Sequence, residues 1–208
     1  LLILFIASSF IVKSQEVESP LILNPLLNTQ EFKFTNSVSS VSLPFIDDFS
    51  YDSHIVDSNL WEYSSVFVNR TYAVNPPTLG VATFDGLGYD GLAYSIDISD
   101  PQGEADILTS KVIDLTDMDS IYIMFYYQPQ GLGDNPQNED SLILEIKNVN
   151  NTWNKIWSLE GSYSQEFIQH IKIISDPIYL HSDFQFRFRN KATLSGNFDH
   201  WNLDYVKV

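Results

Sequence analysis

The 208-residue chain contains no cysteine and has 27 acidic against 11 basic side chains, which gives a formal net charge of −16. The lack of cysteine excludes a disulfide framework, a thiol nucleophile and a zinc–thiolate site. The acidic balance argues against a nucleic-acid partner, because Lys and Arg would have to neutralise the phosphates, and equally against an anionic membrane surface. A chain of this length buries about 70% of its unfolded surface and can fold without a covalent or metal staple.

The first 14 residues, LLILFIASSFIVKS, are the one sustained apolar run. The run is too short to cross a hydrocarbon core of about 30 Å as a helix. With Val12 and Ser14 at its end, it matches the apolar region and cleavage site of a secretory signal peptide whose basic leading region is missing. We therefore expect a secreted or outer-cell-surface protein whose mature domain does not insert into the membrane. A buried first strand or an amphipathic arm is the alternative interpretation.

Residues 15–42 are rich in Ser, Asn and Glu and contain Pro20 and Pro25, which predicts an extended N-terminal arm. From residue 43 onward, short apolar runs of period two alternate with Gly, Pro, Asn and Asp clusters, which is typical of an all-β sandwich. The last apolar run reaches Val208, so we expect the parent protein to continue into further sequence.

The predicted fold of residues 43–208 is a two-sheet antiparallel jelly-roll sandwich of about eleven strands. The clearest strand is Phe184–Arg189, where three Phe alternate with Gln and two Arg. Residues 121–127 (IYIMFYY) are apolar on both faces, which predicts a central strand covered on both sides. In residues 167–174 we expect Ile171 and Ile173 to face the core and His170 to face solvent. The expected strands are 43–50, 61–68, 78–84, 92–98, 106–114, 120–128, 141–148, 153–158, 167–174, 183–190 and 201–208.

The order of these segments from about residue 45 to the end resembles the MAM-type jelly-roll domain. The resemblance is carried by the opening IDDF at 46–49, Trp61, the segment ADILTSKVIDL at 105–115, the aromatic strand MFYY at 124–127 and the closing DHWNLDYV at 199–206. Animal members carry cysteines that this chain lacks. With the signal-like start, the pattern is similar to sandwich domains of large surface proteins from gliding, type 9-secreting Bacteroidota, which implies a role in recognition or adhesion.

Three acidic clusters are candidates for a cation site: Asp47 with Asp48, Asp85 with Asp90, and Asp199 with Asp204. If the first and last strands pair, Asp48 and Asp204 approach each other, and two carboxylates about 5 Å apart repel by about 3 kcal/mol at an effective dielectric near 20. Oxygen ligands without thiolates favour Ca²⁺. The MAM resemblance implies a structural cation at Asp48, Asp85 and Asp204. The alternative is that these residues only form turns and solvated edges.

Two further features are candidate ligand-binding elements. The loop 129–140 (PQGLGDNPQNED) joins two strands and offers Asp134 and Asn138, although a long connection without function is the alternative. Trp153 and Trp157 are four residues apart and would share one face of a strand, as in an aromatic platform for sugars. Core packing is the competing interpretation.

No catalytic pattern is present, since the chain lacks Gly-x-Ser-x-Gly and its four His have no metal-ligand spacing. The sequence therefore favours a non-catalytic recognition or adhesion module, stabilised by Ca²⁺ and binding a protein or a glycan at the cell surface. Two alternatives stay open: a carbohydrate-binding accessory domain of an exported hydrolase, and a structural subunit of an outer-membrane or gliding assembly.

Overall fold

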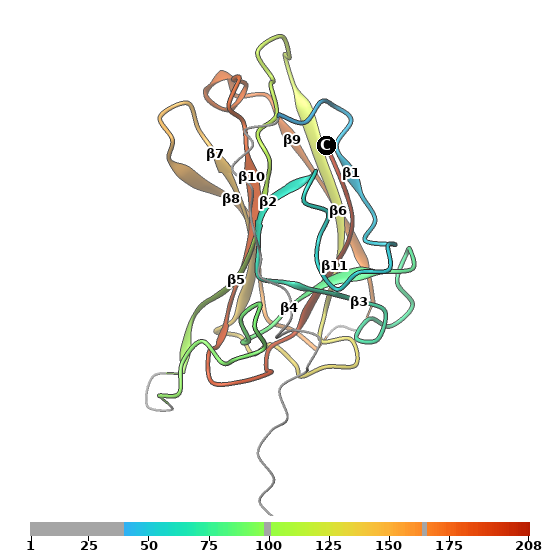
Figure 1. Cartoon of the computed structure of the whole chain (residues 1–208). Helices are drawn as coiled ribbons and strands as arrows, with labels where there is room; N and C mark the ends of the chain where they lie inside the picture. The colour runs from blue at the N-terminus through green and yellow to red at the C-terminus, as the bar shows by residue number, and fades with distance from the viewer. Residues whose placement is uncertain (1–39, 98–100, 164–165) are drawn as a thin grey trace, which may run out of the picture.

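The computed structural model describes residues 40–97, 101–163 and 166–208, which form two antiparallel sheets packed face to face (Figure 1). The six-stranded sheet has the order β3 (Phe67–Asn69), β4 (Val81–Phe84), β11 (Trp201–Lys207), β6 (Ile121–Pro129), β9 (Ile168–Ile174), with β1 (Ile46–Asp47) paired to β11. The five-stranded sheet has the order β2 (Trp61–Ser64), β5 (Gln102–Ser110), β10 (Phe186–Thr193), β7 (Ser141–Lys147), β8 (Trp153–Glu160). This confirms the predicted all-β jelly-roll sandwich.

Several predicted segments lie partly or wholly outside the described residues. The predicted signal peptide at 1–14 is outside them, and so is all but the end of the predicted arm at 15–42. At that end, the Val41 N–H donates to the Val112 carbonyl oxygen at 2.8 Å. The described residues contain one short helix, a 3₁₀ turn at Pro177–Tyr179, and none long or apolar enough to cross a membrane.

Three predicted strands differ clearly from the structure, although the number of strands agrees. The predicted strand 43–50 is reduced to the two residues of β1. The predicted strand 61–68 is divided into β2 and β3, which belong to different sheets. The predicted strand 92–98 is not formed within its described part, residues 92–97, where Ala93 makes an isolated bridge to Leu87. Asp85 and Asp90 accept the N–H groups of the residues two positions further on, so local turns replace the expected strand.

The core is built from aromatic side chains that alternate along the strands. Phe184, Phe186 and Phe188 are fully buried, whereas the side chains between them face outward from the five-stranded sheet. Phe188 meets Phe125 of the opposite sheet edge to face, with ring centroids 4.8 Å apart. Such pairs add to the hydrophobic gain of burial. The core therefore fixes the register of β10 against both neighbouring strands.

A buried hydrogen bond joins the first strand to the other sheet. The Trp61 indole N–H on β2 donates to Asp47 Oδ2 on β1 at 2.6 Å, and Asp47 Oδ1 accepts the Phe49 N–H at 2.9 Å. Burial raises the pKa of Asp47 despite these two donors. The interaction therefore connects the two layers at a position where a lone carboxylate would be costly.

The outer face of β6 and β9 is open, contrary to the prediction of a strand covered on both sides. Tyr122 pairs with Ile173, and Met124 pairs with Ile171, on the side that faces away from the core. Tyr122, Ile171 and Ile173 are each more than half exposed. The predicted orientation of residues 167–174 was wrong as well, because His170 faces inward beside Phe125 and Trp157.

Substitutions on β6 test this assignment of faces. We expect Phe125→Ala to lower the free energy of unfolding by about 3–5 kcal/mol, because it leaves a cavity between the sheets. Tyr122→Ala on the same strand should change it by about 0.5 kcal/mol or less, because the side chain lies at the surface. Urea unfolding of both variants measures the difference. Equal losses would contradict the assignment.

Candidate functional site

The outer face of the five-stranded sheet carries a row of side chains that crosses all five strands. The strand register places Arg187 on β10 between Thr109 on β5 and Glu145 on β7. Tyr63 on β2 pairs with Thr109 at one end of the row, and Lys155 on β8 pairs with Glu145 at the other end. Adjacent rows extend this surface. We call it the polar sheet face and define it by Glu62, Tyr63, Glu104, Glu145, Lys147, Trp153, Lys155, Gln185, Arg187 and Arg189.

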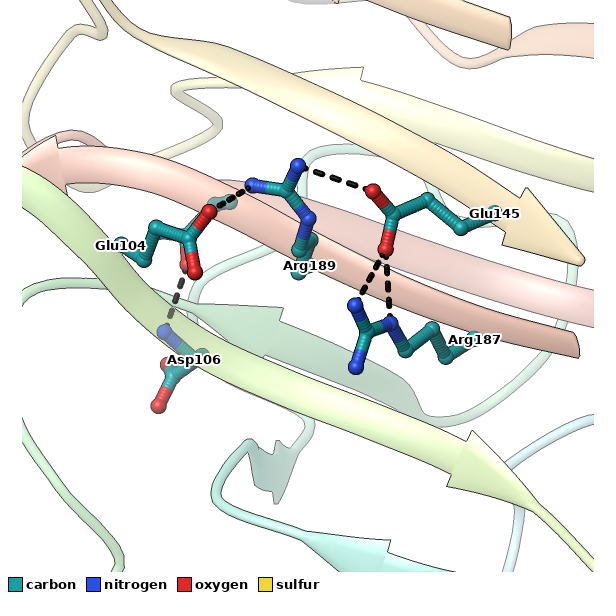
Figure 2. Close-up of polar contacts among 6 residues, drawn as sticks. Glu104, Asp106, Glu145, Arg187 and Arg189 are labelled. Carbon is teal, nitrogen blue, oxygen red and sulfur yellow. Dashed lines mark hydrogen bonds and ion pairs between the residues drawn. The ribbon is translucent and has the colours of Figure 1, made fainter. Parts of the chain in front are cut away.

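Glu145 holds both arginines of the polar sheet face (Figure 2). Its Oε2 accepts from Arg187 Nε at 2.7 Å, and its Oε1 accepts from Arg189 Nη2 at 2.9 Å. Arg189 Nη1 also pairs with Glu104 Oε1 at 2.8 Å, so Arg189 lies between two carboxylates (Figure 2). The Glu145 side chain is only 8% exposed, and charge-assisted bonds of this kind gain strength when shielded from water.

The pKa values of this network keep it charged at neutral pH. Burial by itself would raise the pKa of Glu145, but the hydrogen bonds from Arg189 and Arg187 bring it below its ordinary value. Burial by itself would lower the pKa of Arg189. The hydrogen bond and the negative charge of Glu145 outweigh burial, so the pKa of Arg189 is raised. The guanidinium groups are therefore fixed donors with set directions.

Trp153 lies at the edge of this network. The Arg187 guanidinium carbon is 4.4 Å from the centroid of the Trp153 ring, a cation–π contact. In the adjacent row, Lys147 Nζ donates to Gln185 Oε1 at 2.6 Å, and Gln185 Nε2 donates to Glu62 and to the Ser110 carbonyl oxygen. The half-buried indole thus contacts Arg187 and has Lys147 as its cross-strand partner, and both of these side chains are already bonded to other polar groups.

The prediction that Trp153 and Trp157 share a face is wrong. Trp157 pairs with Leu144 and Lys155 pairs with Glu145, so Ile156 is an extra residue, a β-bulge. A bulge shifts the alternation by one residue. Trp157 therefore faces the core, with ring centroids 5.2 Å from Phe125 and 5.1 Å from His170. Burial and the charge of Lys172 lower the pKa of this inward-facing His170.

The structure brings together two of the three predicted calcium ligands. The Thr78 hydroxyl lies 2.8 Å from Asp204 Oδ1 and 2.7 Å from the Asp48 carbonyl oxygen, and Asp204 Oδ2 accepts the Thr78 N–H at 2.9 Å. Burial raises the pKa of Asp204 to about 6, and the charge of Asp48 contributes. The expected approach of the first and last strands is confirmed by the pairing of β1 with β11.

Asp85, the third predicted ligand, belongs to a separate buried cluster. Asp106 Oδ2 accepts the Asp85 N–H at 2.8 Å, and Asp106 Oδ1 accepts from the Tyr94 hydroxyl at 2.8 Å. Burial raises the pKa of Asp85 to about 7. Burial and the charge of Asp85 also raise the pKa of Asp106. Among the described residues, no group of three or more acidic or His side chains is placed to hold a metal, so calcium binding stays a prediction.

In the 129–140 loop, Asp134 is exposed and contacts His200 through its backbone. The Asp134 N–H donates to His200 Nδ1 at 2.8 Å, and the His200 N–H donates to the Asp134 carbonyl oxygen at 3.1 Å. The His200 ring stacks on Tyr72 with centroids 4.7 Å apart. Asn138 is exposed near the end of the loop. Ligand binding by Asp134 and Asn138 stays a prediction.

No protein-family model matches the chain, and no curated protein sequence matches it. The solved structures to which the chain is similar include carbohydrate-binding modules. The xylan-binding domain CBM22-1 of Xyn10C from Paenibacillus barcinonensis has 10% identity and a TM-score of 0.44, over 81% of this chain and 95% of that chain. TmCBM61, solved with β-1,4-galactotriose, has 13% identity and a TM-score of 0.41, over 69% and 80%. A family 16 carbohydrate-binding module has 14% identity and a TM-score of 0.39, over 71% and 91%.

At this level of similarity the neighbours say nothing of what this chain binds. The resemblance to MAM-type domains and the Bacteroidota origin stay predictions. Sequence reasoning included Trp153 as a ligand-binding residue but missed Arg187, Arg189 and Glu145. The alternation around Phe184–Arg189 had already placed the two arginines on one outer face.

The buried Asp85 makes a pH-dependent prediction. Its pKa is about 7 in the folded chain against 3.8 as the ordinary value, so the folded state holds a proton that the unfolded chain releases between about pH 4 and 7. The free energy of unfolding should therefore fall as pH rises through this interval, by at most about 1.4 kcal/mol per pH unit for one proton.

Asp85→Asn should reduce this dependence, because an amide stays neutral, and should leave the part that comes from Asp106 and Asp204, whose pKa values burial also raises. Asp90→Asn, at an exposed position of the same loop, should leave the dependence unchanged. Urea unfolding between pH 4.5 and 7.5 measures both variants. A wild-type slope retained in Asp85→Asn would show that the proton is held elsewhere.

Proposed function

We propose that this chain is a non-catalytic glycan-binding module of a secreted or cell-surface protein, and that the polar sheet face is its binding surface. The observation that carries the proposal is the half-buried Trp153 ring held by Arg187 beside paired Arg and Glu side chains. An indole offers an apolar surface for the C–H face of a sugar ring. The neighbouring guanidinium, carboxylate and amide groups offer bonds to its hydroxyls.

The rigidity of the polar sheet face supports this proposal. Arg187 and Arg189 are already held by Glu145, and Gln185 is held by Ser110, so little side-chain freedom is left to lose on binding. Groups fixed before the ligand arrives bind it with a smaller entropic cost. The strands themselves are spaced by about 4.8 Å, so the face spans roughly 19 Å from β2 to β8.

The polar sheet face lacks the excess of negative charge that the whole chain carries. The whole chain has a net charge of −16, yet on this face four basic side chains stand against three glutamates, and the two arginines are paired with Glu145 and Glu104. A neutral oligosaccharide meets no net repulsion there, and its hydroxyls can accept from Arg and donate to Glu.

A protein partner is the second candidate, and a different surface favours it. Tyr122, Ile171 and Ile173 form an exposed apolar stripe on the outer face of the six-stranded sheet. Exposed apolar surface of this kind is often covered by another protein. Either partner fits an adhesion module, an accessory domain of an exported hydrolase or a structural subunit of a surface assembly. The apolar run at 1–14 supports a secreted location.

Substitution of Trp153 tests the glycan proposal. We expect the wild-type chain to bind at least one member of an array of soluble oligosaccharides. Trp153→Ala should weaken that binding by about tenfold or more, since loss of one aromatic anchor commonly costs over 1 kcal/mol. Glu145→Gln should weaken it as well, because the arginines lose a charged partner.

Tyr122→Ala, on the opposite sheet, is the matched control and should bind as the wild type does. Thermal melting of each variant establishes that it is folded. Full affinity in Trp153→Ala, or loss of affinity in Tyr122→Ala, would refute the assignment of the binding face.

A further inference from the structure

Two buried carboxyl groups outside the polar sheet face adjoin each other where the 129–140 loop meets the start of β11. Asp140 and Asp199 are both fully buried, with no exposed surface. Their side chains contact each other across this junction. Register explains the contact, because Ser141 pairs with Lys191, which places Asp140 beside the end of β10. The Thr193 N–H at that end donates to Asp199 Oδ2 at 2.7 Å.

Each carboxyl group accepts a backbone hydrogen bond at only one of its oxygens. Asp140 Oδ2 accepts the Gln137 N–H at 2.7 Å, as Asp199 Oδ2 accepts that of Thr193. The other two oxygens, Asp140 Oδ1 and Asp199 Oδ1, are buried and have no hydrogen-bond partner in the described structure. Buried carboxylate oxygens without a donor or a cation are costly, so these two require either a proton shared between the two carboxyl groups or a bound cation.

A third buried oxygen without a partner lies in the same loop. It is Asn135 Oδ1, and Asn135 directly follows Asp134, whose Oδ2 accepts the Asp199 N–H at 3.4 Å. In the described part of the chain, neither Asp140 nor Asp199 forms an ion pair with Lys or Arg. The junction therefore collects oxygen acceptors and lacks a cationic side chain that would satisfy them.

We propose that Asp140 and Asp199 bind a structural Ca²⁺ ion, and that the ion fixes the 129–140 loop to the start of β11. Two carboxylates, completed by oxygen atoms of the loop or by water, suit Ca²⁺, which takes six to eight oxygen ligands in flexible geometry. This site differs from the one expected at Asp48, Asp85 and Asp204, and it does not depend on glycan binding.

The loop has further restraints that would set the site in place. The Gly161 N–H donates to the Asp140 carbonyl oxygen at 3.0 Å, and a Cβ at Gly161 would lie 1.9 Å from the Gln137 carbonyl oxygen. The loop therefore packs directly on the end of β8, and only glycine permits this approach. Residues on both sides of Asp140 are held before any ion binds.

The test is thermal melting of the full chain in 1 mM CaCl₂ and in 1 mM EDTA. A ligand that binds only the folded state raises its midpoint, and at a concentration well above the dissociation constant we expect a rise of about 5 °C or more. Mg²⁺ at the same concentration should give a smaller rise, because it prefers strict octahedral geometry. Isothermal titration with CaCl₂ should give one site per chain.

Asp140→Asn and Asp199→Asn should each lose the calcium-dependent rise while keeping the hydrogen bond that the remaining oxygen accepts. Asp48→Asn is the matched control and should keep the rise. Equal wild-type midpoints in CaCl₂ and EDTA, with no heat of titration, would overturn the proposal and leave a proton shared between the two carboxyl groups. A rise that persists in both Asn variants, or that disappears in Asp48→Asn, would overturn the location.

Discussion

The alternation of side chains along β10 is the constraint on which both the core and the proposed binding face depend. Phe186 and Phe188 point into the sandwich, and the pleat then obliges Arg187 and Arg189 to point out of it. A slip of one residue would bury two guanidinium groups and expose two aromatic rings, so the register has no competing alternative. Because β10 lies between β5 and β7, its arginines reach Glu104 on one side and Glu145 on the other (Figure 2).

Much of the architecture follows from local pattern, and the failures have identifiable physical causes. Strands with one polar and one apolar row, such as β7 and β10, could be predicted with their orientation. In β9 both rows contain isoleucine, and the row that ends in the buried Ile174 lies on the core side and includes His170, which pairs with the buried Phe125. The outer row is stabilised by cross-strand pairing with Tyr122 and Met124, which depends on tertiary contacts and not on the segment itself.

In the candidate site, too, some features follow from the local sequence, whereas others depend on contacts between strands that are distant in the chain. The two arginines share a face by simple alternation, and Glu145 opposes Arg187 once β7 and β10 are paired. The bulge at Ile156, by contrast, leaves no mark in composition, and it separates Trp153 from Trp157. The acidic residues are a further case, since their role depends on neighbours distant in sequence: Asp85 meets Asp106, and Asp140 meets Asp199.

The proposed binding face is tested most directly by the indole N–H signals of the four tryptophans in a ¹⁵N-labelled sample. The tightest-binding oligosaccharide of the array is titrated into the chain. The account predicts that the Trp153 signal shifts progressively, while the signal of Trp61, which is bonded to Asp47 inside the sandwich, does not. An unchanged Trp153 signal at saturation, with shifts confined to residues of β6 and β9, would contradict it.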